Sequence, residues 1–388
     1  MSYEYSEDNL IEQTAIELFL NRLGWDTLVA YNKETFGEGS TLGRLNKKEV
    51  VLKRIFLEKL EQFNPRLPQK AYNEAYEKLI EESTVKSLAE INFEKYQLLR
   101  DGIPIDFINQ KGEHIKNKRL KAFDFETPDN NNFLAVRQLW LEGKSNRKRR
   151  TDIIGFVNGI PLLFVELKAA HRKLENAYND NFTDYKDVIP KLFYYNAFVV
   201  LSNGIASRIG SLTGKYQHFH EWKRITEEDE GVVALDRIIV GICEKNRFLD
   251  LFENFILFDN SLGKTIKLIA RNHQFIGVNK ALDNIELKDQ LYKLGKITFE
   301  EKQKLGVFWH TQGSGKSYSM VFFCQKIHRK FTGSYTFLLV TDRNELDTQI
   351  YGTFSGVGAV PQVKAGSANS LKASSGNHLK ELLCSEHR

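Results

Sequence analysis

The 388-residue chain is 41% hydrophobic and 27% charged, with a formal net charge of +5 and a pI near 8.8. These values exclude a disordered or fibrous protein, predict two or three domains, and permit nucleic-acid binding without requiring it. The chain starts without a secretory signal, has no apolar run of about 18 residues, and scatters its three cysteines, so we expect a reduced cytoplasmic protein without a membrane span.

Helices are predicted for most of the first hundred residues. An apolar stripe with helical spacing runs from Leu10 to Leu23, and the range 50–100 repeats that spacing, with apolar residues from Val51 to Ile80, which predicts two further helices. From Asp106 onward the pattern changes towards strands.

The range 132–201 is predicted to form a mixed α/β unit. A strand is expected at 132–140, then a polar connector at 143–150, and then a hairpin over 152–168 whose turn is an Asn-Gly pair. A helix over 174–185 and an apolar strand over 197–201 follow. This order predicts a sheet with helices packed on it.

The predicted hairpin carries two acids and a lysine. Side chains alternate along a strand, so Glu166 and Lys168 share one face of the second arm, while Asp152 begins the first arm. That face is otherwise apolar, and burying unpaired charge costs roughly several kcal/mol, so a metal or substrate should compensate. A surface salt-bridge ladder is the alternative. The triplet 286–288 has the same Glu-Leu-Lys letters in a helical stretch, where the two charges do not share a face.

The turn of this hairpin decides whether the two carboxylates can meet. A strict two-residue turn would place Asp152 opposite Val165, on the wrong face. A three-residue loop with a glycine bulge would instead place Asp152 opposite Phe164 and diagonal to Glu166. We therefore predict such a bulge.

Two carboxylates and a lysine suit Mg²⁺-dependent cleavage of a phosphodiester bond. Mg²⁺ prefers hard oxygen ligands and keeps several waters, so Asp152 and Glu166 are the candidate metal ligands. A metal-activated water is the expected nucleophile, and Lys168 would orient it or offset charge on the phosphate. These three residues form the predicted catalytic group.

The densest positive cluster in the chain immediately precedes Asp152. Cations placed here could neutralise phosphates beside a scissile bond, which predicts DNA binding. A solvated, charged connector is the alternative. The cluster consists of Lys144, Arg147, Lys148, Arg149 and Arg150.

A second unit is predicted beyond residue 255, around a glycine-rich loop at 311–317. An apolar strand is expected before the loop at 305–309, a helix after it at 317–329, and another strand at 336–341. Strand, loop, helix and strand form a βαβ unit, which predicts a parallel sheet.

The glycine-rich loop is typical of a phosphate-binding P-loop. In such a loop, backbone N–H groups and a helix N-terminus face the phosphates of ATP, lysine reaches the β and γ oxygens, and serine binds Mg²⁺. His310 stands where the full template has glycine. The roles are assigned to Gly313, Gly315, Lys316 and Ser317, with Ser317 as the Mg²⁺ ligand.

Four short segments form a recognisable series in the first part of the chain. They are Asn132-x-x-x-x-x-Gln138, Arg150-Thr-Asp152-Ile-Ile, Val157-Asn-Gly-Ile-Pro-Leu162 and Val165-Glu-Leu-Lys168. The series resembles the PD-(D/E)xK endonuclease domain in the motor (R) subunit of type I restriction enzymes. The resemblance implies that the predicted catalytic group is the cleavage site. It also implies accessory roles for Glu12, whose alternative is a solvated helix face, and for Tyr185 in a Gln-x-x-x-Tyr motif where Asn181 replaces glutamine.

Three later segments carry a second resemblance. They are Arg271-Asn-His-Gln274-Phe, Trp309-His-Thr-Gln-Gly-Ser-Gly-Lys-Ser317 and Leu339-Val-Thr-Asp342-Arg343-Asn-Glu-Leu346. The second and third are similar to consecutive motifs of superfamily 2 helicases, as found in the same motor subunits. The first resembles their adenine-recognition element, which implies that Gln274 contacts the base of ATP. A polar loop is the alternative for Gln274.

Together the resemblances imply an α/β protein with a PD-(D/E)xK domain and N-terminal helices over 1–255. A truncated first RecA-like lobe with a parallel sheet is implied over 256–388. They also imply Mg²⁺ and ATP as cofactors, cleavage of duplex DNA coupled to ATP-driven translocation, and methyltransferase and specificity subunits as partners. No Asp-Glu-x-His motif follows Lys316, so we expect poor ATP hydrolysis by these residues alone. The alternatives are a helicase-nuclease of another defence or repair system, and an inactive fragment that only docks on partners.

Overall fold

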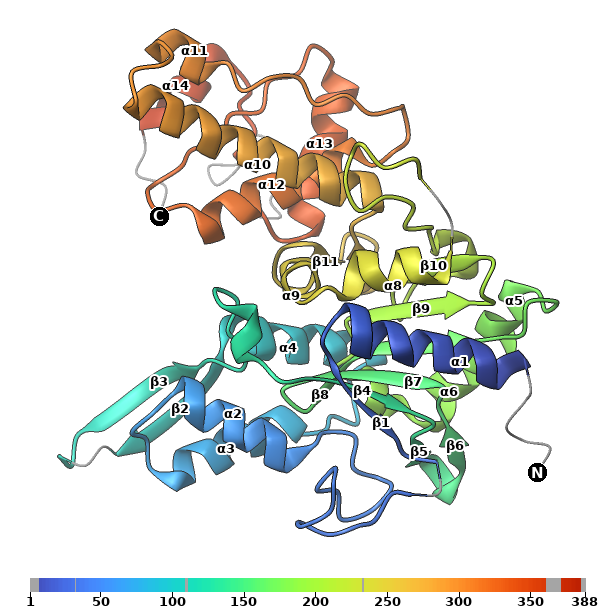
Figure 1. Cartoon of the computed structure of the whole chain (residues 1–388). Coiled ribbons are helices and arrows are strands. Elements are labelled where there is room, and N and C mark those ends of the chain that lie inside the picture. Colours follow the sequence, from blue (N-terminus) through green and yellow to red (C-terminus); the bar gives the residue numbers. More distant parts are fainter. Residues whose placement is uncertain (1–6, 32, 109–110, 232–233, 361–370, 385–388) are drawn as a thin grey trace. The chain divides into compact units, whose positions relative to one another are not determined.

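A computed structural model of the protein is shown in Figure 1. It describes residues 7–31, 33–108, 111–231, 234–360 and 371–384. The chain divides into two compact units, residues 1–256 and 257–388. Within the described ranges, no helix is both long and apolar enough to span a bilayer.

The first unit is built around a six-stranded mixed sheet in the order β1-β4-β7-β8-β9-β10. β1 pairs in parallel with β4, and β8 with β9, while the other neighbours are antiparallel. The strands are β1 (Asp26–Val29), β4 (Phe133–Arg137), β7 (Ile153–Val157), β8 (Ile160–Leu167), β9 (Phe198–Ser202) and β10 (Ser207–Gly210). Two separate hairpins are formed by β2 (Ile103–Ile108) with β3 (His114–Leu120), and by β5 (Trp140–Glu142) with β6 (Lys148–Arg150).

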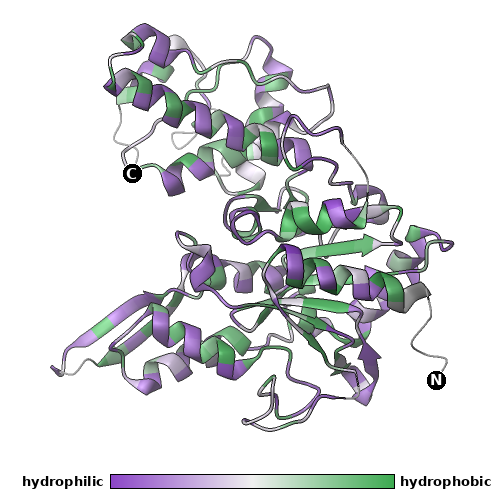
Figure 2. Ribbon diagram, viewed as in Figure 1, coloured by the Kyte–Doolittle hydropathy of each residue, from purple (hydrophilic) through white to green (hydrophobic). Residues whose placement is uncertain are grey.

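Helices pack on both faces of this sheet, and Figure 2 shows hydrophobic residues concentrated on its strands. Adjacent residues of a strand point to opposite faces, so the rings of the two faces form separate cores. On one face, Trp25 packs at ring-centroid distances of 4.9 to 5.5 Å against Phe19, Phe133 and Phe248. On the other face, Phe164 packs against Phe182, Tyr185 and Phe193.

The helices of this unit begin with α1, which continues as a π-helical turn, and include a second π-helical turn between α5 and α6. Their bounds are α1 (Glu7–Glu17), η1 (Leu18–Arg22), α2 (Lys53–Phe63), α3 (Gln69–Ile80), α4 (Leu88–Asp101), α5 (Leu174–Asn176), η4 (Ala177–Phe182), α6 (Thr183–Val188), α7 (Pro190–Phe193), α8 (Leu235–Cys243) and α9 (Lys245–Asn254). Single 3₁₀ turns are η2 (Pro128–Asn130), η3 (Lys144–Asn146) and η5 (Tyr216–His218). Two helices are predicted over 50–100; α2 and α3 confirm the two apolar stripes, but the count is wrong, because α4 forms a third helix in this range.

The strand predicted at 132–140 is interrupted in the structure. β4 ends at Arg137, because Gln138 adopts a left-handed backbone conformation with φ of 56°. The chain then enters β5, which pairs with β6. The polar connector predicted at 143–150 is therefore wrong in part, since its last residues form β6 of an ordered hairpin.

The β7–β8 hairpin also differs from its prediction. Val157 pairs with Ile160, so the Asn-Gly pair forms a strict two-residue turn. The φ angles of Asn158 and Gly159 are 50° and 77°, and two positive φ angles match the twist of the flanking strands. The three-residue loop with a glycine bulge is therefore wrong. The register instead shifts between Gly155 and Phe156, where β8 holds one residue more than β7. This displaced bulge, and not the turn, sets the pairing beyond it.

The second unit is mainly helical. Its two-stranded sheet is formed by β11, which starts at the unit boundary, and β12. The elements are β11 (Ile256–Asp259), β12 (Ile266–Ile269), α10 (Asn272–Lys293), α11 (Phe299–Gln303), α12 (Lys316–Lys330), α13 (Asn344–Gly356) and α14 (Gly376–Cys384).

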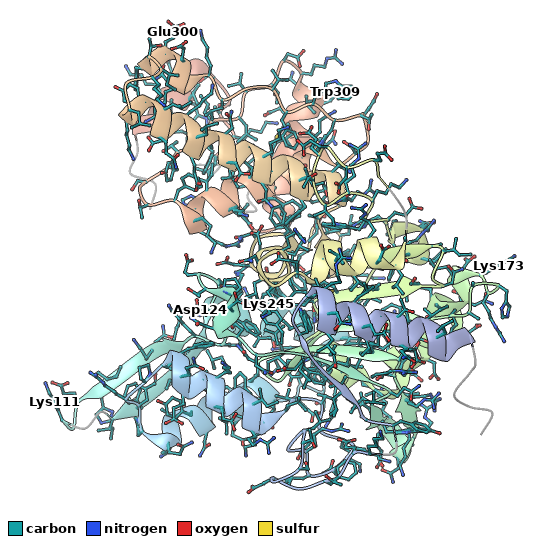
Figure 3. All side chains as sticks on the ribbon, viewed as in Figure 1. Lys111, Asp124, Lys173, Lys245, Glu300 and Trp309 are labelled. Carbon is teal, nitrogen blue, oxygen red and sulfur yellow. The ribbon has the colours of Figure 1, made fainter. Side chains whose placement is uncertain are left out.

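The strands predicted at 305–309 and 336–341 are not formed. Both segments lack regular structure, and Val307, Trp309 and Val340 are 93%, 78% and 82% exposed; Figure 3 labels Trp309. The parallel sheet expected around the P-loop is therefore absent from the described residues. A parallel strand is stable when neighbouring strands pair its backbone and helices cover both faces, and the described residues provide no such neighbours here.

Candidate functional site

Asp152, Glu166 and Lys168 lie together at one end of the β7–β8 pair. Continuing the β7–β8 register by one residue places Asp152 opposite Glu166, on the same face of the sheet. Lys168 Nζ donates to Glu166 Oε1 at 2.9 Å, and Asp152 Oδ2 accepts from the backbone N–H of Leu167 at 2.7 Å. Glu166 is fully buried, whereas Asp152 and Lys168 keep partial exposure. The three side chains form one cluster that solvent reaches from the side of Asp152 and Lys168.

Both carboxyl groups of the cluster have raised pKa values. Burial raises the pKa of Glu166 to about 7, against the lowering effects of Lys168 and of the Asn181 side chain. Burial is also the largest cause of the raised pKa of Asp152, and the charges of Glu166 and Glu12 add to it. Desolvation and like charge both disfavour two carboxylates with no cation between them. The cluster is therefore arranged to receive positive charge.

The donor atoms of the cluster fit a divalent cation such as Mg²⁺. Glu166 Oε2 is buried without a hydrogen-bond partner among the described residues. An unsatisfied carboxylate oxygen costs free energy that a metal–ligand bond would recover. No group of three or more His, Cys, Asp or Glu in the described ranges is placed to hold a metal. A two-carboxylate site suits Mg²⁺, which keeps several waters as ligands.

Glu12 on α1 lies beside this cluster and is buried, so the alternative of a solvated helix face is wrong. Its Oε2 atom accepts from Arg137 Nε at 2.7 Å and from Gln138 Nε2 at 2.8 Å. Its charge raises the pKa of both Asp152 and Glu166. Arg137, which the sequence analysis did not single out, holds this charge in place. A cation at the end of an apolar strand is the signal that could have identified it.

Tyr185 lies under the cluster on α6. Its ring packs against Phe164 with centroids 5.2 Å apart, and its hydroxyl donates to the backbone oxygen of Arg150. Burial and the charge of Glu166 hold the pKa of Tyr185 far above its usual value. The hydroxyl therefore stays protonated and ties α6 to the strand that leads into the site. The side chain of Asn181, one turn earlier, lowers the pKa of Glu166 by hydrogen bonding.

Most of the basic cluster before Asp152 is already paired with acids. Arg149 donates two hydrogen bonds, at 2.6 and 3.0 Å, to the carboxylate of Asp184. The guanidinium of Arg150 lies 5.1 Å from the ring centroid of Tyr31. DNA binding by this cluster stays a prediction, and it would require three of the cations to exchange carboxylates for phosphates. The pairs are Arg147–Asp187, Lys148–Glu142 and Arg149–Asp184.

The glycine-rich loop of the second unit leads directly into α12. Gly313 and Gly315 have φ of 75° and 87°, a conformation that favours glycine. A Cβ atom at Gly313 would meet nothing within 4 Å, so the loop is open on that side. Lys316 Nζ donates to the backbone oxygen of His310 at 2.8 Å, and Ser317 lies in the first turn of α12. A cation and a helix N-terminus thus adjoin an open loop, which fits the phosphates of ATP.

Gln274 lies in the first turn of α10, so the polar-loop alternative for this residue is wrong. Its buried side chain donates from Nε2 to the backbone oxygen of Gly315 at 2.9 Å and accepts at Oε1 from the N–H of Arg271 at 2.8 Å. His273 Nε2 lies 3.0 Å from the backbone oxygen of Ser314. The amide of Gln274 therefore connects α10 to the P-loop. Its contact with an adenine base stays a prediction.

Comparison with known proteins gives two family matches. Residues 4–218 match the family described as type I restriction enzyme R protein N terminus, and residues 273–388 match SWI2/SNF2 ATPase. The chain is 37% identical over 358 residues to the type I restriction enzyme HindI endonuclease subunit of Haemophilus influenzae, covering 90% of this chain and 32% of that protein. It is 30% identical over 386 residues to a candidate MjaIXP endonuclease subunit of a type I restriction enzyme from Methanocaldococcus jannaschii. That match covers 91% of this chain and 34% of that protein.

The chain spans about a third of the length of these curated relatives. The R protein match extends over more than half of the chain, including the sheet that holds Asp152, Glu166 and Lys168, and the ATPase match includes the P-loop. The chain therefore belongs to the family of type I restriction enzyme R proteins.

Proposed function

We propose that the first unit is a Mg²⁺-dependent DNA endonuclease of the PD-(D/E)xK type. The observation that carries this proposal is the buried Glu166, whose Oε2 has no hydrogen-bond partner in the part of the chain that the structure describes, while its Oε1 accepts from Lys168. Asp152 lies opposite on the neighbouring strand. Two carboxylates with raised pKa values and an adjacent lysine form a site for a cation and a phosphate group.

The residues of the cluster divide the work of cleaving a phosphodiester bond. Asp152 and Glu166 would hold Mg²⁺, which supplies Lewis-acid activation of the phosphodiester and of water when bound. Lys168, partly exposed beside Glu166, is placed to offset negative charge that develops on the phosphate. Glu12 and Tyr185 act as positioning residues, because they contact the elements around the cluster.

The second unit is proposed to bind ATP through the P-loop. Lys316 would exchange the backbone oxygens of His310 and Thr311 for phosphate oxygens, and Ser317 would bind Mg²⁺. Residues 1–255 are then the nuclease domain, and residues 256–388 belong to the ATP-driven motor part of the protein. Both relatives are named as type I restriction endonuclease subunits, which supports this pairing.

The whole R protein is proposed to cleave double-stranded DNA in a reaction coupled to ATP-driven translocation. Its proposed partners are the methyltransferase and specificity subunits of a type I restriction complex. Another subunit would read the DNA sequence, because the contacts proposed for this cluster are with a cation and a phosphate and not with bases.

Nicking of supercoiled plasmid DNA in Mg²⁺ tests the nuclease proposal. We expect Asp152→Ala and Lys168→Ala each to reduce nicking by at least about 100-fold, since each removes a group that acts on the reacting phosphate. Lys288→Ala is the matched control, because Lys288 belongs to the second Glu-Leu-Lys triplet, on helix α10, and should leave nicking unchanged.

The assay is run on the chain alone and on the complex assembled with the methyltransferase and specificity subunits. A folded wild-type chain that cleaves in neither form would overturn the proposal and favour a fragment that only docks on partners. Equal activity of wild type and the two cluster variants would place the nuclease site elsewhere.

A further inference from the structure

The β2–β3 hairpin of the first unit carries a second concentration of positive charge. Figure 2 shows it as mostly hydrophilic, and Figure 3 places Lys111 at its far end. Between residues 111 and 121 the only acid is Glu113. The exposed cations of this stretch are Lys111, Lys116, Lys118, Arg119 and Lys121.

Three of these cations, Lys116, Lys118 and Lys121, form no ion pair with any described residue, in contrast to the paired arginines before Asp152. Lys121 interacts with Asp124 only at longer range. The acid across the hairpin is also engaged, because Asp106 Oδ1 accepts from the backbone N–H of Asn117 at 2.7 Å. This bond lies at a bulge, where Asn117 has φ of 52° and the register shifts. The bulge thus turns Asp106 towards the backbone and leaves the lysines available.

The hairpin is anchored at its base and exposed beyond it. Ile103, Ile105 and Leu120 are fully buried, whereas the distal residues of β3 are exposed apart from the half-buried Ile115. Lys78 on α3 donates to the backbone oxygen of Pro104 at 2.9 Å and fixes the first strand. An isolated two-stranded hairpin is marginally stable in water, so this anchoring holds the charged ribbon in a defined position.

We propose that the β2–β3 hairpin binds the backbone of double-stranded DNA, independently of the cleavage cluster. The inference rests on the proposed function in taking DNA as the ligand of this unit. A two-stranded ribbon fits the width of the major groove, and lysines placed along it meet phosphates without reading sequence. In Figure 3, Lys111 at the hairpin tip and Lys173, which follows the cleavage cluster, lie on opposite sides of the first unit. The hairpin tip thus lies away from the segment that follows the cleavage cluster.

The test is the affinity of the full chain for a short fluorescent duplex, measured by anisotropy in EDTA between about 50 and 200 mM salt. The variant Lys116→Gln/Lys118→Gln/Lys121→Gln should lose at least about tenfold in affinity at the middle of that range. The slope of log affinity against log salt concentration should be smaller in magnitude by about two to three, because each lost phosphate contact reduces that slope by about 0.9. The triple Lys→Arg variant should bind as the wild type does.

A matched control removes the same charge from paired lysines of the same unit. Lys86, Lys191 and Lys223 pair with Glu94, Glu82 and Glu221, so their triple Gln variant should retain its affinity and salt dependence. Exposed lysines also protect strand edges from pairing with other chains. If they only do that here, the hairpin variant will aggregate and its monomer will bind DNA normally, which overturns the inference. Stronger competition by single-stranded DNA or RNA than by duplex also overturns it.

The nicking assay separates this inference from the nuclease proposal. Loss of duplex affinity in the hairpin variant, with no cleavage by the wild type, would support the hairpin and refute the nuclease. Cleavage by the wild type, with unchanged duplex affinity in the hairpin variant, would support the nuclease proposal and refute the hairpin inference. Absence of any duplex binding by the wild-type chain refutes the hairpin inference.

Discussion

Glu166, the proposed metal ligand, is buried at the expense of stability. Its pKa is raised from 4.5 to about 7, so the folded protein binds its proton more tightly than the unfolded chain does. Stability from this group is fully present below pH 4.5 and is lost as the pH rises towards 7. Above pH 7 the folded protein must hold a buried charge.

Glu166→Gln should therefore stabilise the metal-free protein at pH 8 while weakening Mg²⁺ binding. One pKa unit corresponds to about 1.4 kcal/mol, so we expect a gain of about 1–3 kcal/mol in the free energy of unfolding. Thermal unfolding in EDTA checks this at pH 8 and pH 5. The difference from wild type should nearly vanish at pH 5, and an equal gain at both pH values would show that ionisation is not its cause.

Lys168 lowers the pKa of Glu166 through its charge and its hydrogen bond, so Lys168→Gln should raise that pKa above about 7. Protons then compete with Mg²⁺ for Glu166 most strongly at low pH. Calorimetric titration with Mg²⁺ at pH 6, 7 and 8 should therefore show an affinity, relative to wild type, that increases as the pH rises. Lys173→Gln, at an exposed position, is the control. A ratio of affinities that does not vary with pH would contradict the coupling between Lys168 and Glu166.

At the scale of elements, the β7–β8 turn is also a packing surface. The N–H of Leu52 donates to the backbone oxygen of Gly159 at 2.8 Å, which docks the turn on the start of α2. Gly159 has φ of 77°, and a Cβ atom there would lie 2.6 Å from the backbone oxygen of Leu52. Glycine is required both by the turn and by this approach.

Gly159→Ala should destabilise the first unit by about 2–4 kcal/mol, since it combines backbone strain with a steric clash. Gly112 offers a matched control, because its φ is 80° and nothing lies within 4 Å of its Cβ position. Gly112→Ala should cost only about 1 kcal/mol, from strain alone. Urea unfolding measures both, and equal losses would mean that the docking of the turn on α2 contributes nothing.

At the scale of the whole molecule, the proposed nuclease cluster and the P-loop lie in different compact units. A ligand that binds one folded unit raises the free energy of unfolding of that unit by about 2.7 kcal/mol when its concentration is a hundred times its dissociation constant. The unfolding temperature of that unit rises accordingly. ATP should therefore act on the transition of the second unit.

Lys316→Ala should abolish the stabilisation of the second unit by Mg-ATP and leave the transition of the first unit unchanged. Differential scanning calorimetry with and without nucleotide resolves the two transitions. Lys304→Ala is the control, because Lys304 is an exposed lysine of the same unit that pairs with Glu300. Persistence of the ATP shift in Lys316→Ala would place the nucleotide outside the P-loop.

Features set by neighbouring residues could be predicted from the sequence alone. Alternation along β8 placed Glu166 and Lys168 together, the Asn-Gly pair marked the turn, and the loop before α12 identified the P-loop. Each depends on backbone geometry over a few residues, which local sequence controls.

Only the tertiary structure decided how distant residues meet. The bulge lies within β8 and the turn docks against α2; that bulge, not a wider loop, sets Asp152 opposite Glu166. The pairing of Glu12 with Arg137 joins residues far apart in the chain. The segments at 305–309 and 336–341 are apolar enough for strands but have no neighbours to pair with among the described residues. Register, desolvation and charge pairing depend on contacts between remote segments, and for that reason local patterns do not determine them.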